Sequence, residues 1–503
     1  MSTAASLGID VGTQSTKAVL ASADGTILAE CAVSHGVDMP APGFAEQDAE
    51  RIWWGDVVSL CRQVTALAGG TEISAVTVSG LGPCVLPCDE RVRPLRPGIL
   101  YGIDTRATDE IAELNELLGE TEILARSGSA LSSQAGGPKI AWLRRHQPGI
   151  WARTRFVHSA HSFVTHRLTG RYLFDHHTAS QYDPMYDMTT GSWHATWARQ
   201  LAGRVELPEL VWPGAIAGHI TAEAATQTGL RPGTPVVTGT IDAWAEAYSV
   251  NVAAPGDLML MYGSTMFLVL CASRPRFHQG VWTTQGMVPG VETYAAGMAT
   301  SGLLLRWLCD ITGLTFDEAL AAAAAVRPGS DGVLCLPYFA GERSPIFDPS
   351  ARGTFAGLTI RHGRGHLIRA GYEAVAYGIR HNLDVLAGLG VEPRRVVAVG
   401  GGTTGDLWTR IVSDVTGLTQ EIPSVTTGAA YGDALLGAIA VGLVPPGAAW
   451  NKASRLIEPD PATASLYDAG YASYRQLADQ VEPVSRALAH VQQAALPPAP
   501  RPA

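Results

Sequence analysis

The stretch LGIDVGTQSTKAVL, residues 7–20, contains the pattern on which the fold assignment depends. Two apolar segments flank a polar turn from Gly12 to Gln14, and a second turn signal, Asp24-Gly25, precedes a further apolar segment, ILAECAVSH. Alternation of apolar runs with Gly-containing turns is typical of antiparallel strands. We therefore predict a β-meander over the first 45 residues, followed by a helix from about Asp48 to Ala68.

The second half of the chain repeats this pattern. The stretch DLMLMYGSTMFLVLCAS, residues 257–273, again places a polar Gly-containing turn between two apolar segments. Later segments predict a helix at 366–386, a strand at 395–400, and helices at 407–415 and 428–441. We infer an α/β fold with an internal duplication, in which each half contributes one lobe. The predicted domains are residues 1–245, residues 246–485 and a disordered Ala/Pro-rich tail at 486–503.

Composition and charge exclude several classes of function. The chain has 503 residues, of which 46% are hydrophobic and 16% charged, with a net charge of −10. These values are typical of a globular protein, and no stretch gathers enough Lys or Arg to bind nucleic acid. No run approaches the roughly 18 apolar residues of a membrane span, and the start, MSTAASLGIDVG, lacks the features of a secretory signal. Seven scattered cysteines do not suggest a disulfide framework, so we expect a cytoplasmic location.

The turn after the first strand is a candidate phosphate-binding site. Gly12 lets backbone N–H groups approach an anion, and the hydroxyls of Thr13 and Ser15 are further donors. Asp10 is costly to bury unless it faces a cleft or a cation, which indicates a role linked to Mg²⁺. An ordinary hairpin with a solvated Asp explains the same residues. The turn YGST at 262–265 offers the same donors, and the two turns together would hold a polyphosphate from both sides.

Three other polar segments each allow two interpretations. The loop GGGTTGD at 400–406 lies between a strand and a helix, and its glycines favour the approach of a ligand over a plain turn. Asp242 follows an apolar strand, where an Asp is either a helix N-cap or a base in a cleft. Asp104 and Arg106 form either a salt bridge in a loop or a contact to a polar substrate.

Packing is the better explanation for the histidines of the first half, because no carboxylate or Cys pattern typical of a metal site accompanies them. They are His158, His161, His166, His176 and His177.

Three segments match motifs of one known family. They are GIDVGTQSTKAVL, AVGGGTTGDLWTRIVSDVTG and, most specific of the three, LPYFAGERSPIFDPSARGTFAGLT. From Leu7 to about Leu443 the chain resembles the FGGY family of carbohydrate kinases, and PLRPGILYGIDTRA is most similar to a xylulokinase segment. The resemblance implies the two-lobed actin-like ATPase fold, a duplicated ribonuclease H-like architecture. It also implies a kinase that uses ATP and Mg²⁺.

The same resemblance implies roles for individual residues. Asp242 falls on the catalytic base of the family, and Asp10 on the carboxylate that orients Mg²⁺. The implied ATP contacts are Thr13, Gln14, Ser15, Lys17, Gly263, Ser264, Gly401, Gly402 and Asp406. The implied substrate contacts are Gly82, Pro83, Asp104, Arg106 and Asp242.

Three departures from the family pattern concern the substrate. Xylulokinases have a Met-His pair where this chain has Gly82-Pro83, and an amide where this chain has Ala243, with the bulky Trp244 next. The small residues that precede the catalytic Asp in the family are replaced here by Thr240-Ile241. Each buried hydroxyl left without a partner costs on the order of 1–3 kcal/mol, so these changes should alter specificity.

We therefore expect an ATP-dependent kinase that phosphorylates a primary hydroxyl of a xylulose-like pentulose or a polyol, with Asp242 as general base. Alternatives are a kinase of another ketose or sugar alcohol, such as ribulose, glycerol or erythritol, an actin-like or chaperone-like ATPase without a sugar acceptor, and a silent sugar sensor. Retention of Asp10, both turns and Asp242 argues against the sensor. The expected partners are a small sugar or polyol and ATP, with no nucleic acid and no membrane. A homodimer is the candidate assembly.

Overall fold

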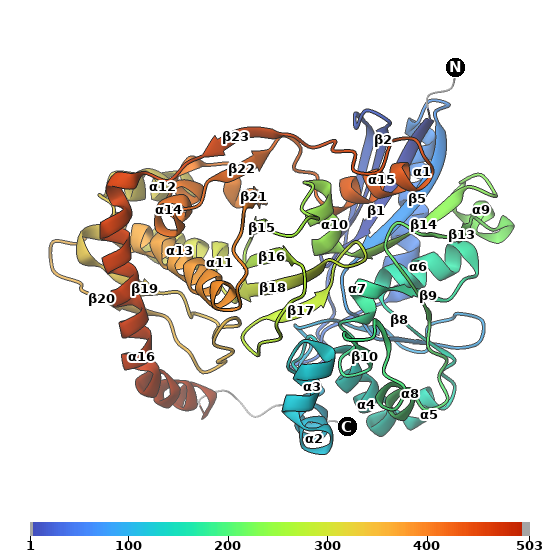
Figure 1. Ribbon diagram of the computed structural model, residues 1–503, viewed down its shortest axis with the longest axis horizontal. Helices are drawn as coiled ribbons and strands as arrows, with labels where there is room; N and C mark the ends of the chain where they lie inside the picture. The colour runs from blue at the N-terminus through green and yellow to red at the C-terminus, as the bar shows by residue number, and fades with distance from the viewer. Residues whose placement is uncertain (1–3, 495–503) are drawn as a thin grey trace. The chain divides into compact units, whose positions relative to one another are not determined.

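The computed structural model describes residues 4–494, which form two compact units (Figure 1). The first unit comprises the described residues up to Ala253 together with Ser273–Thr293 and Thr427–Lys452. The second comprises Ala254–Ala272, Tyr294–Thr426 and the described residues from Ala453 onward. The domain boundary between residues 245 and 246 stays a prediction of the sequence.

The first unit is built on a six-stranded sheet in the order β13-β14-β5-β1-β2-β3. β1 pairs antiparallel with β2 and parallel with β5, and β14 pairs parallel with β5. The carboxyl ends of β1, β5 and β14 therefore meet at one edge of the sheet. The strands are β1 (Ala4–Val11), β2 (Ser15–Ser22), β3 (Ile27–Ser34), β5 (Glu72–Gly80), β13 (Ile216–His219) and β14 (Pro235–Ile241).

The two faces of β1 pack against different helices, because successive side chains of a strand point to opposite faces. Leu7 and Ile9 belong to the apolar core that includes residues of α1 (Gly55–Leu67) and α6 (Ala160–Thr169). On the other face, α15 (Ala429–Ala440) packs against β1 and β5. A side chain at Gly8 would overlap the carbonyl oxygen of Ala430, so only glycine permits this close approach.

The first unit also contains further helices and short strands. The helices are η1 (Ala49–Trp54), α2 (Thr108–Leu118), α3 (Glu120–Ser127), α4 (Gly136–His146), α5 (Pro148–Trp151), α7 (His176–Ala179), α8 (Trp197–Ala202), α9 (Ala222–Thr228) and α10 (Asp242–Ser249). The short strands are β4 (Glu46–Gln47), β6 (Leu86–Cys88), β7 (Gly98–Ile99), β8 (Phe156–His158), β9 (Leu173–Asp175), β10 (Tyr186–Asp187), β11 (Ser192–Trp193), β12 (Glu209–Val211) and β17 (Trp282–Gln285).

The second unit repeats the strand arrangement of the first. β15 (Asp257–Tyr262) pairs antiparallel with β16 (Met266–Ala272) and parallel with β21 (Arg395–Val399), as β1 pairs with β2 and β5. The sheet continues in the order β18-β16-β15-β21-β22-β23. The other strands are β18 (Glu292–Met298), β19 (Leu334–Leu336), β20 (Thr354–Ala356), β22 (Gln420–Pro423) and β23 (Ala453–Ile457). The helices are α11 (Gly302–Thr312), α12 (Phe316–Ala324), η2 (Ser330–Gly332), α13 (Arg364–Gly388), η3 (Gly401–Thr403), α14 (Asp406–Thr416), η4 (Pro461–Thr463) and α16 (Ala464–Ala494).

Most predicted elements are confirmed, and one is corrected. The meander forms as β1 to β3, and Asp48 caps η1 by accepting hydrogen bonds from the backbone N–H groups of Glu50 and Arg51. Residues 486–494, predicted as part of a disordered tail, are helical, because α16 continues to Ala494 and buries Ala489. Residues 495–503 of that predicted tail lie outside the described residues.

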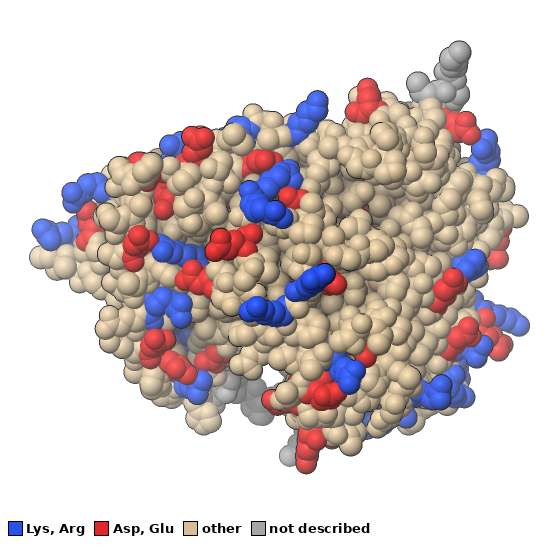
Figure 2. All heavy atoms as spheres, viewed as in Figure 1, with Lys and Arg blue, Asp and Glu red and all other residues tan. Residues whose placement is uncertain are grey.

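The surface charge and the apolar character of the helices agree with what the composition predicts. On the face shown in Figure 2, acidic and basic side chains are interspersed over a mostly uncharged surface. Within residues 4–494, no helix combines the length and the apolar character needed to cross a membrane.

The contact between β1 and α15 generates the first prediction. Gly8→Ala places a methyl group against the backbone of Ala430 and Ala434, which cannot move without shifting α15. Overpacking of this kind costs about 1–3 kcal/mol, so we expect a lower midpoint of thermal unfolding, measured by calorimetry. Gly36→Ala is the matched control, because a side chain there meets no atom within 4 Å. An unchanged midpoint for Gly8→Ala would contradict the proposed tight packing.

Candidate active site

The turn between β1 and β2 is held in place by polar contacts from neighbouring loops. The Gly12 N–H donates to the Ser15 carbonyl over 3.0 Å, and the Gly12 carbonyl lies 3.0 Å from His35 Nε2. The Thr13 carbonyl accepts a hydrogen bond from Gln47 Nε2, and the Thr13 hydroxyl lies 2.9 Å from the Tyr101 hydroxyl. These contacts fix the backbone around the exposed side chain of Gln14.

Asp10 lies near the end of β1, at the edge where three parallel strands finish. Its sheet partners are Lys17 on β2 and Ser79 on β5. Burial raises the pKa of Asp10 well above its usual value, Asp242 and Glu246 raise it further, and Lys17 lowers it. Asp10 Oδ1 is buried and has no hydrogen-bond partner within residues 4–494. The side chain therefore carries an acceptor that the described chain leaves unsatisfied.

Asp242 follows the last residue of β14 and begins α10. The N-cap of this helix is Ile241, and the Asp242 carboxylate accepts a hydrogen bond from the Ala243 N–H over 2.7 Å. Burial raises the pKa of Asp242, whereas the Ala243 bond and the charge of His161 lower it. The helix N-cap interpretation of Asp242 is therefore wrong, and its partly exposed carboxylate shares an electrostatic environment with Asp10.

Two further carboxyl groups lie beside Asp10 and Asp242, and sequence reasoning missed both. Glu246 lies one turn along α10 from Asp242. Burial and Asp242 raise the pKa of Glu246 to about 7, while Lys17 lowers it. The i, i+4 spacing of two acids in DAWAEA is the signal that could have indicated this pair.

Asp433 comes from α15, far along the chain. Its carboxylate accepts hydrogen bonds from the Ser79 N–H over 3.0 Å and from the Ser79 hydroxyl over 2.5 Å. The side chain is fully buried, and burial raises its pKa well above the usual value, with Asp10 and Asp242 acting in the same direction. The signal in the sequence is one acid inside the apolar helix AAYGDALLGAIA. We call Asp10, Asp242, Glu246 and Asp433 the carboxyl cluster.

The predicted substrate residues Asp104 and Arg106 form a buried salt bridge. The Arg106 guanidinium donates to both carboxylate oxygens of Asp104 and pairs with Glu46 over 2.7 Å. It also lies over the rings of Phe44 and Trp142, at 4.0 and 4.9 Å from their centroids. Both side chains have no exposed surface. The geometry favours the salt-bridge interpretation, and the substrate role stays a prediction.

The loop at Gly82-Pro83 lies against β14 and α6. A side chain at Gly82 would lie 2.9 Å from Ile241 and 3.1 Å from the Ser159 hydroxyl. Gln134 Nε2 donates to the Gly82 carbonyl over 3.3 Å and lies 3.1 Å from the side-chain oxygen of Gln181. Cys84 is fully buried, which raises the pKa of its thiol. The half-buried Gln134 had no distinguishing signal in the sequence.

The second turn, in the second unit, is braced by the start of α11. The N–H groups of Ser301 and Gly302 donate to the carbonyls of Ser264 and Gly263, each over 3.1 Å. The Ser301 hydroxyl also donates to the Gly263 carbonyl, over 2.9 Å. The side chains of Ser264 and Thr265 remain exposed, so their hydroxyls are accessible.

Packing explains two of the three glycines in the predicted adenosine loop. A side chain at Gly400 would lie 2.7 Å from the Tyr262 carbonyl oxygen, and one at Gly402 would lie 2.6 Å from the Trp408 ring. Gly401 meets no atom within 4 Å. Asp406 forms an ion pair with Arg455 of β23. Only Gly401 therefore has the open surroundings that the sequence interpretation attributed to all three.

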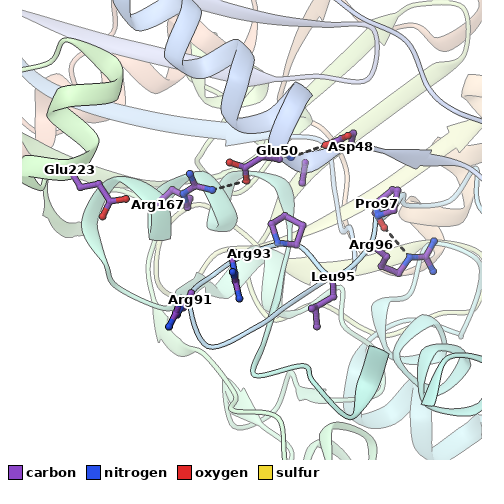
Figure 3. A pocket seen from close by; sticks show the side chains of 11 residues that line it. Asp48, Glu50, Arg91, Arg93, Leu95, Arg96, Pro97, Arg167 and Glu223 are labelled. Atoms are coloured by element: carbon purple, nitrogen blue, oxygen red, sulfur yellow. Dashed lines mark hydrogen bonds and ion pairs between the residues drawn. The ribbon is translucent and has the colours of Figure 1, made fainter. Parts of the chain in front are cut away.

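A pocket of about 670 Å³ in the first unit is separate from these groups (Figure 3). Three of its four arginines form ion pairs: Arg93 with Asp89 over 2.7 Å, Arg167 with Glu50 over 2.7 Å, and Arg96 with Glu46. No member of the carboxyl cluster lines it. The lining residues are Asp48, Ala49, Glu50, Arg91, Arg93, Pro94, Leu95, Arg96, Pro97, Arg167 and Glu223.

Comparison with known proteins decides the family. The N-terminal domain of the FGGY family of carbohydrate kinases matches residues 5–248, and the C-terminal domain of that family matches residues 258–441. The chain belongs to the FGGY family of carbohydrate kinases. The predicted resemblance, the two-domain actin-like ATPase fold and the sugar kinase class of the enzyme are thereby confirmed.

Several relatives of this FGGY kinase match it over nearly the whole chain. It is 29% identical to the gluconokinase of Bacillus subtilis (strain 168), covering 87% of this chain and 88% of the relative. It is 28% identical to the xylulose kinase of Escherichia coli (strain K12), covering 95% and 99%. The crystal structure of xylulose kinase from Rhodospirillum rubrum has a TM-score of 0.89 and 31% identity, covering 96% and 99%.

The carboxyl cluster makes the stability of this FGGY kinase depend on pH. The folded state holds the Glu246 proton up to a pH of about 7, whereas the unfolded chain releases it near its ordinary pKa of 4.5. Stability is therefore lost as the pH rises between these two values, by at most about 3 kcal/mol. Glu246→Gln removes this titration, so its thermal midpoint should fall less than that of the wild type between about pH 5 and pH 8.

The control for this measurement is Glu116→Gln, which neutralises an exposed acid on α2. It should follow the wild-type pH dependence. A Glu246→Gln profile parallel to the wild type would contradict the assigned shift.

Proposed function

We propose that this kinase transfers the terminal phosphoryl group of ATP to a primary hydroxyl of a small sugar or polyol, with Asp242 as the general base. The supporting observation is the proximity of Asp10 and Asp242, because the Asp242 charge raises the pKa of Asp10. Phosphoryl transfer needs a base at the attacking hydroxyl and a cation near the phosphates. The two carboxylates at one sheet edge are suited to these two tasks.

Asp10 fits the requirements of a Mg²⁺ ligand. Its Oδ1 is buried without a partner among the described residues, and Mg²⁺ prefers oxygen ligands. We propose that Asp10 holds Mg²⁺, directly or through water. When bound, Mg²⁺ neutralises negative charge on the transferred phosphoryl group.

Residues of the first unit would carry out the proton transfer and bind phosphate. The Ala243 N–H bond fixes one carboxylate oxygen of Asp242 and leaves the other to accept the hydroxyl proton. The side chains of Thr13 and Ser15 would donate to phosphate oxygens. Lys17, opposite Asp10 on the neighbouring strand, places a positive charge beside the same site.

The proposed acceptor is a xylulose-like pentulose or a related polyol, and gluconate is a second candidate. Identity to two gluconokinases, at 29% and 27%, is within one percentage point of that to two xylulose kinases, at 28% and 26%. Gly82, Pro83 and Ala243 offer no side-chain hydrogen bonds to hydroxyls. The Gln134 side-chain oxygen, which accepts the Gly102 N–H over 3.2 Å, has a second lone pair that could accept a substrate hydroxyl at that loop. The cytoplasmic location and the candidate homodimer stay predictions of the sequence.

The role of Asp242 is tested by Asp242→Asn. The amide oxygen can still accept the Ala243 N–H bond, but the side chain can no longer take a proton at neutral pH. A general base contributes about 10²–10⁴-fold, so kcat should fall by this factor while the Kd for ATP, measured by calorimetry, stays unchanged. Asp109→Asn on the exposed side of α2 is the control. Near-normal turnover of Asp242→Asn would refute the assignment.

The acceptor is tested by ADP release from MgATP with D-xylulose, D-ribulose, D-gluconate, erythritol or glycerol. We expect at least one of them to raise the rate of ADP release well above the rate with water alone, because a bound hydroxyl replaces water as nucleophile. The acceptor with the highest kcat/KM identifies the class. ADP release that is independent of all five would instead favour an ATPase without a sugar acceptor.

A further inference from the structure

β14 loses its regular pairing just before Asp242. The register between β14 and β5 shifts between Thr238 and Ile241, which leaves Gly239 and Thr240 in a bulge. A side chain at Gly239 would overlap the Val78 carbonyl oxygen, so this residue has to be glycine. Bulges next to active sites re-aim the side chains that follow them. The direction in which the chain enters α10 therefore depends on contacts outside the strand ladder.

A buried aspartate supplies the contact at this bulge. The Thr240 hydroxyl donates to Asp175 Oδ1 over 2.7 Å, and both side chains are fully buried. The same carboxylate oxygen caps α7 by accepting the Thr178 N–H over 2.9 Å. The other oxygen, Oδ2, lies 2.9 Å from His161 Nε2 on α6. Asp175 thus connects the end of β14 to two helices.

The charge of Asp175 makes these bonds strong. Burial alone would raise the pKa of Asp175, but the hydrogen bond and charge of His161, together with His177 and Thr178, lower it to about 2. Hydrogen bonds to an ionised carboxylate are stronger than neutral ones. Removing one donor from a buried carboxylate is correspondingly costly.

His161, which contacts Asp175, also lies close to the strand end that precedes Asp242. The backbone nitrogen of His161 would lie 3.3 Å from a side chain at Gly80, and Gly80 is the sheet partner of Ile241. His161 also interacts electrostatically with Asp242. Its Nδ1 is buried and has no hydrogen-bond partner within the described chain. His161 Nε2 also lies 3.3 Å from the Thr178 hydroxyl, so the shorter contact to Asp175 and this second contact hold the ring at the same end.

We propose that Thr240, Asp175 and His161 are positioning residues that aim Asp242 at the acceptor hydroxyl, an inference that depends on the proposed role of Asp242 as base. Asp175 anchors the bulge through Thr240, and His161 holds Asp175 in place. A displacement of a catalytic group by about 1 Å can cost on the order of 10²-fold in rate, so the orientation of this strand end matters for turnover.

The decisive comparison is Thr240→Val against Thr240→Ser. Valine has nearly the shape of threonine but no hydroxyl, whereas serine keeps the donor to Asp175. We expect kcat to fall about 10–100-fold in Thr240→Val and less than about 3-fold in Thr240→Ser, with KM for ATP unchanged in both. The assays use D-xylulose and D-gluconate, and also ADP release from MgATP with water as the only acceptor. The last assay needs no sugar.

Thr238→Val is the matched control for loss of a buried hydroxyl. Thr238 lies in the same strand and is 2% exposed, but its hydroxyl has no partner in the described chain. Thr238→Val should retain wild-type kcat. The thermal midpoint of each variant is measured, so that a loss of folded protein is separated from a loss of turnover.

Variants of His161 test the other end of the arrangement. His161→Gln can still place an amide N–H near Asp175, whereas His161→Leu cannot. We expect His161→Gln to retain most of the wild-type kcat and His161→Leu to lose most of it. Wild-type kcat in both Thr240→Val and His161→Leu, with only the thermal midpoint lowered, would show a structural role and overturn the proposal. Failure of the base assignment is recognised separately, because Asp242→Asn would then keep its turnover.

Discussion

Repulsion among four carboxyl groups is the constraint on which the arrangement of the first unit depends. Asp10, Asp242, Glu246 and Asp433 lie at one end of the sheet, and burial raises the pKa of every one of them. Each buried ion that lacks a cationic partner costs several kcal/mol, so the cluster does not stabilise the fold. It is consistent with a site whose ligand brings positive charge, as the proposed Mg²⁺ would.

Tight contacts between segments that are distant in the sequence hold these carboxyl groups together despite their repulsion. Gly8 lets α15 approach the backbone of β1, and Asp433 on that helix binds both donors of Ser79. Ser79 is in turn the sheet partner of Asp10. On the far side of β5, the bulge before Asp242 is tied to α7 through Asp175. Asp10 and the strand end before Asp242 are thus each connected to a buried aspartate through one intervening residue, Ser79 or Thr240.

The sequence predicts the parts of this arrangement that are local. The hairpin around Gly12, the Asp at the end of an apolar strand and the helix after Asp48 all follow from periodicity and turn chemistry, and the structure contains them. Asp433 could not be placed by such reasoning, because it reaches the cluster through a contact with a residue 354 positions away. The bulge at Thr240 could not be predicted either, because it is defined by the pairing of β14 with β5, which is distant in the sequence.

The Gly82-Pro83 loop shows why family membership leaves the sugar open. The strand end before Asp242 is held through Thr240, but Gly82 also packs against it, because a side chain at Gly82 would lie 2.9 Å from Ile241. Gly82 and Pro83 present no side-chain donor or acceptor, and both N–H groups of Gln134 already donate to the Gly82 carbonyl and to the Gln181 side-chain oxygen. Selectivity for a sugar therefore has to come from groups other than the side chains of this loop and the Gln134 N–H donors.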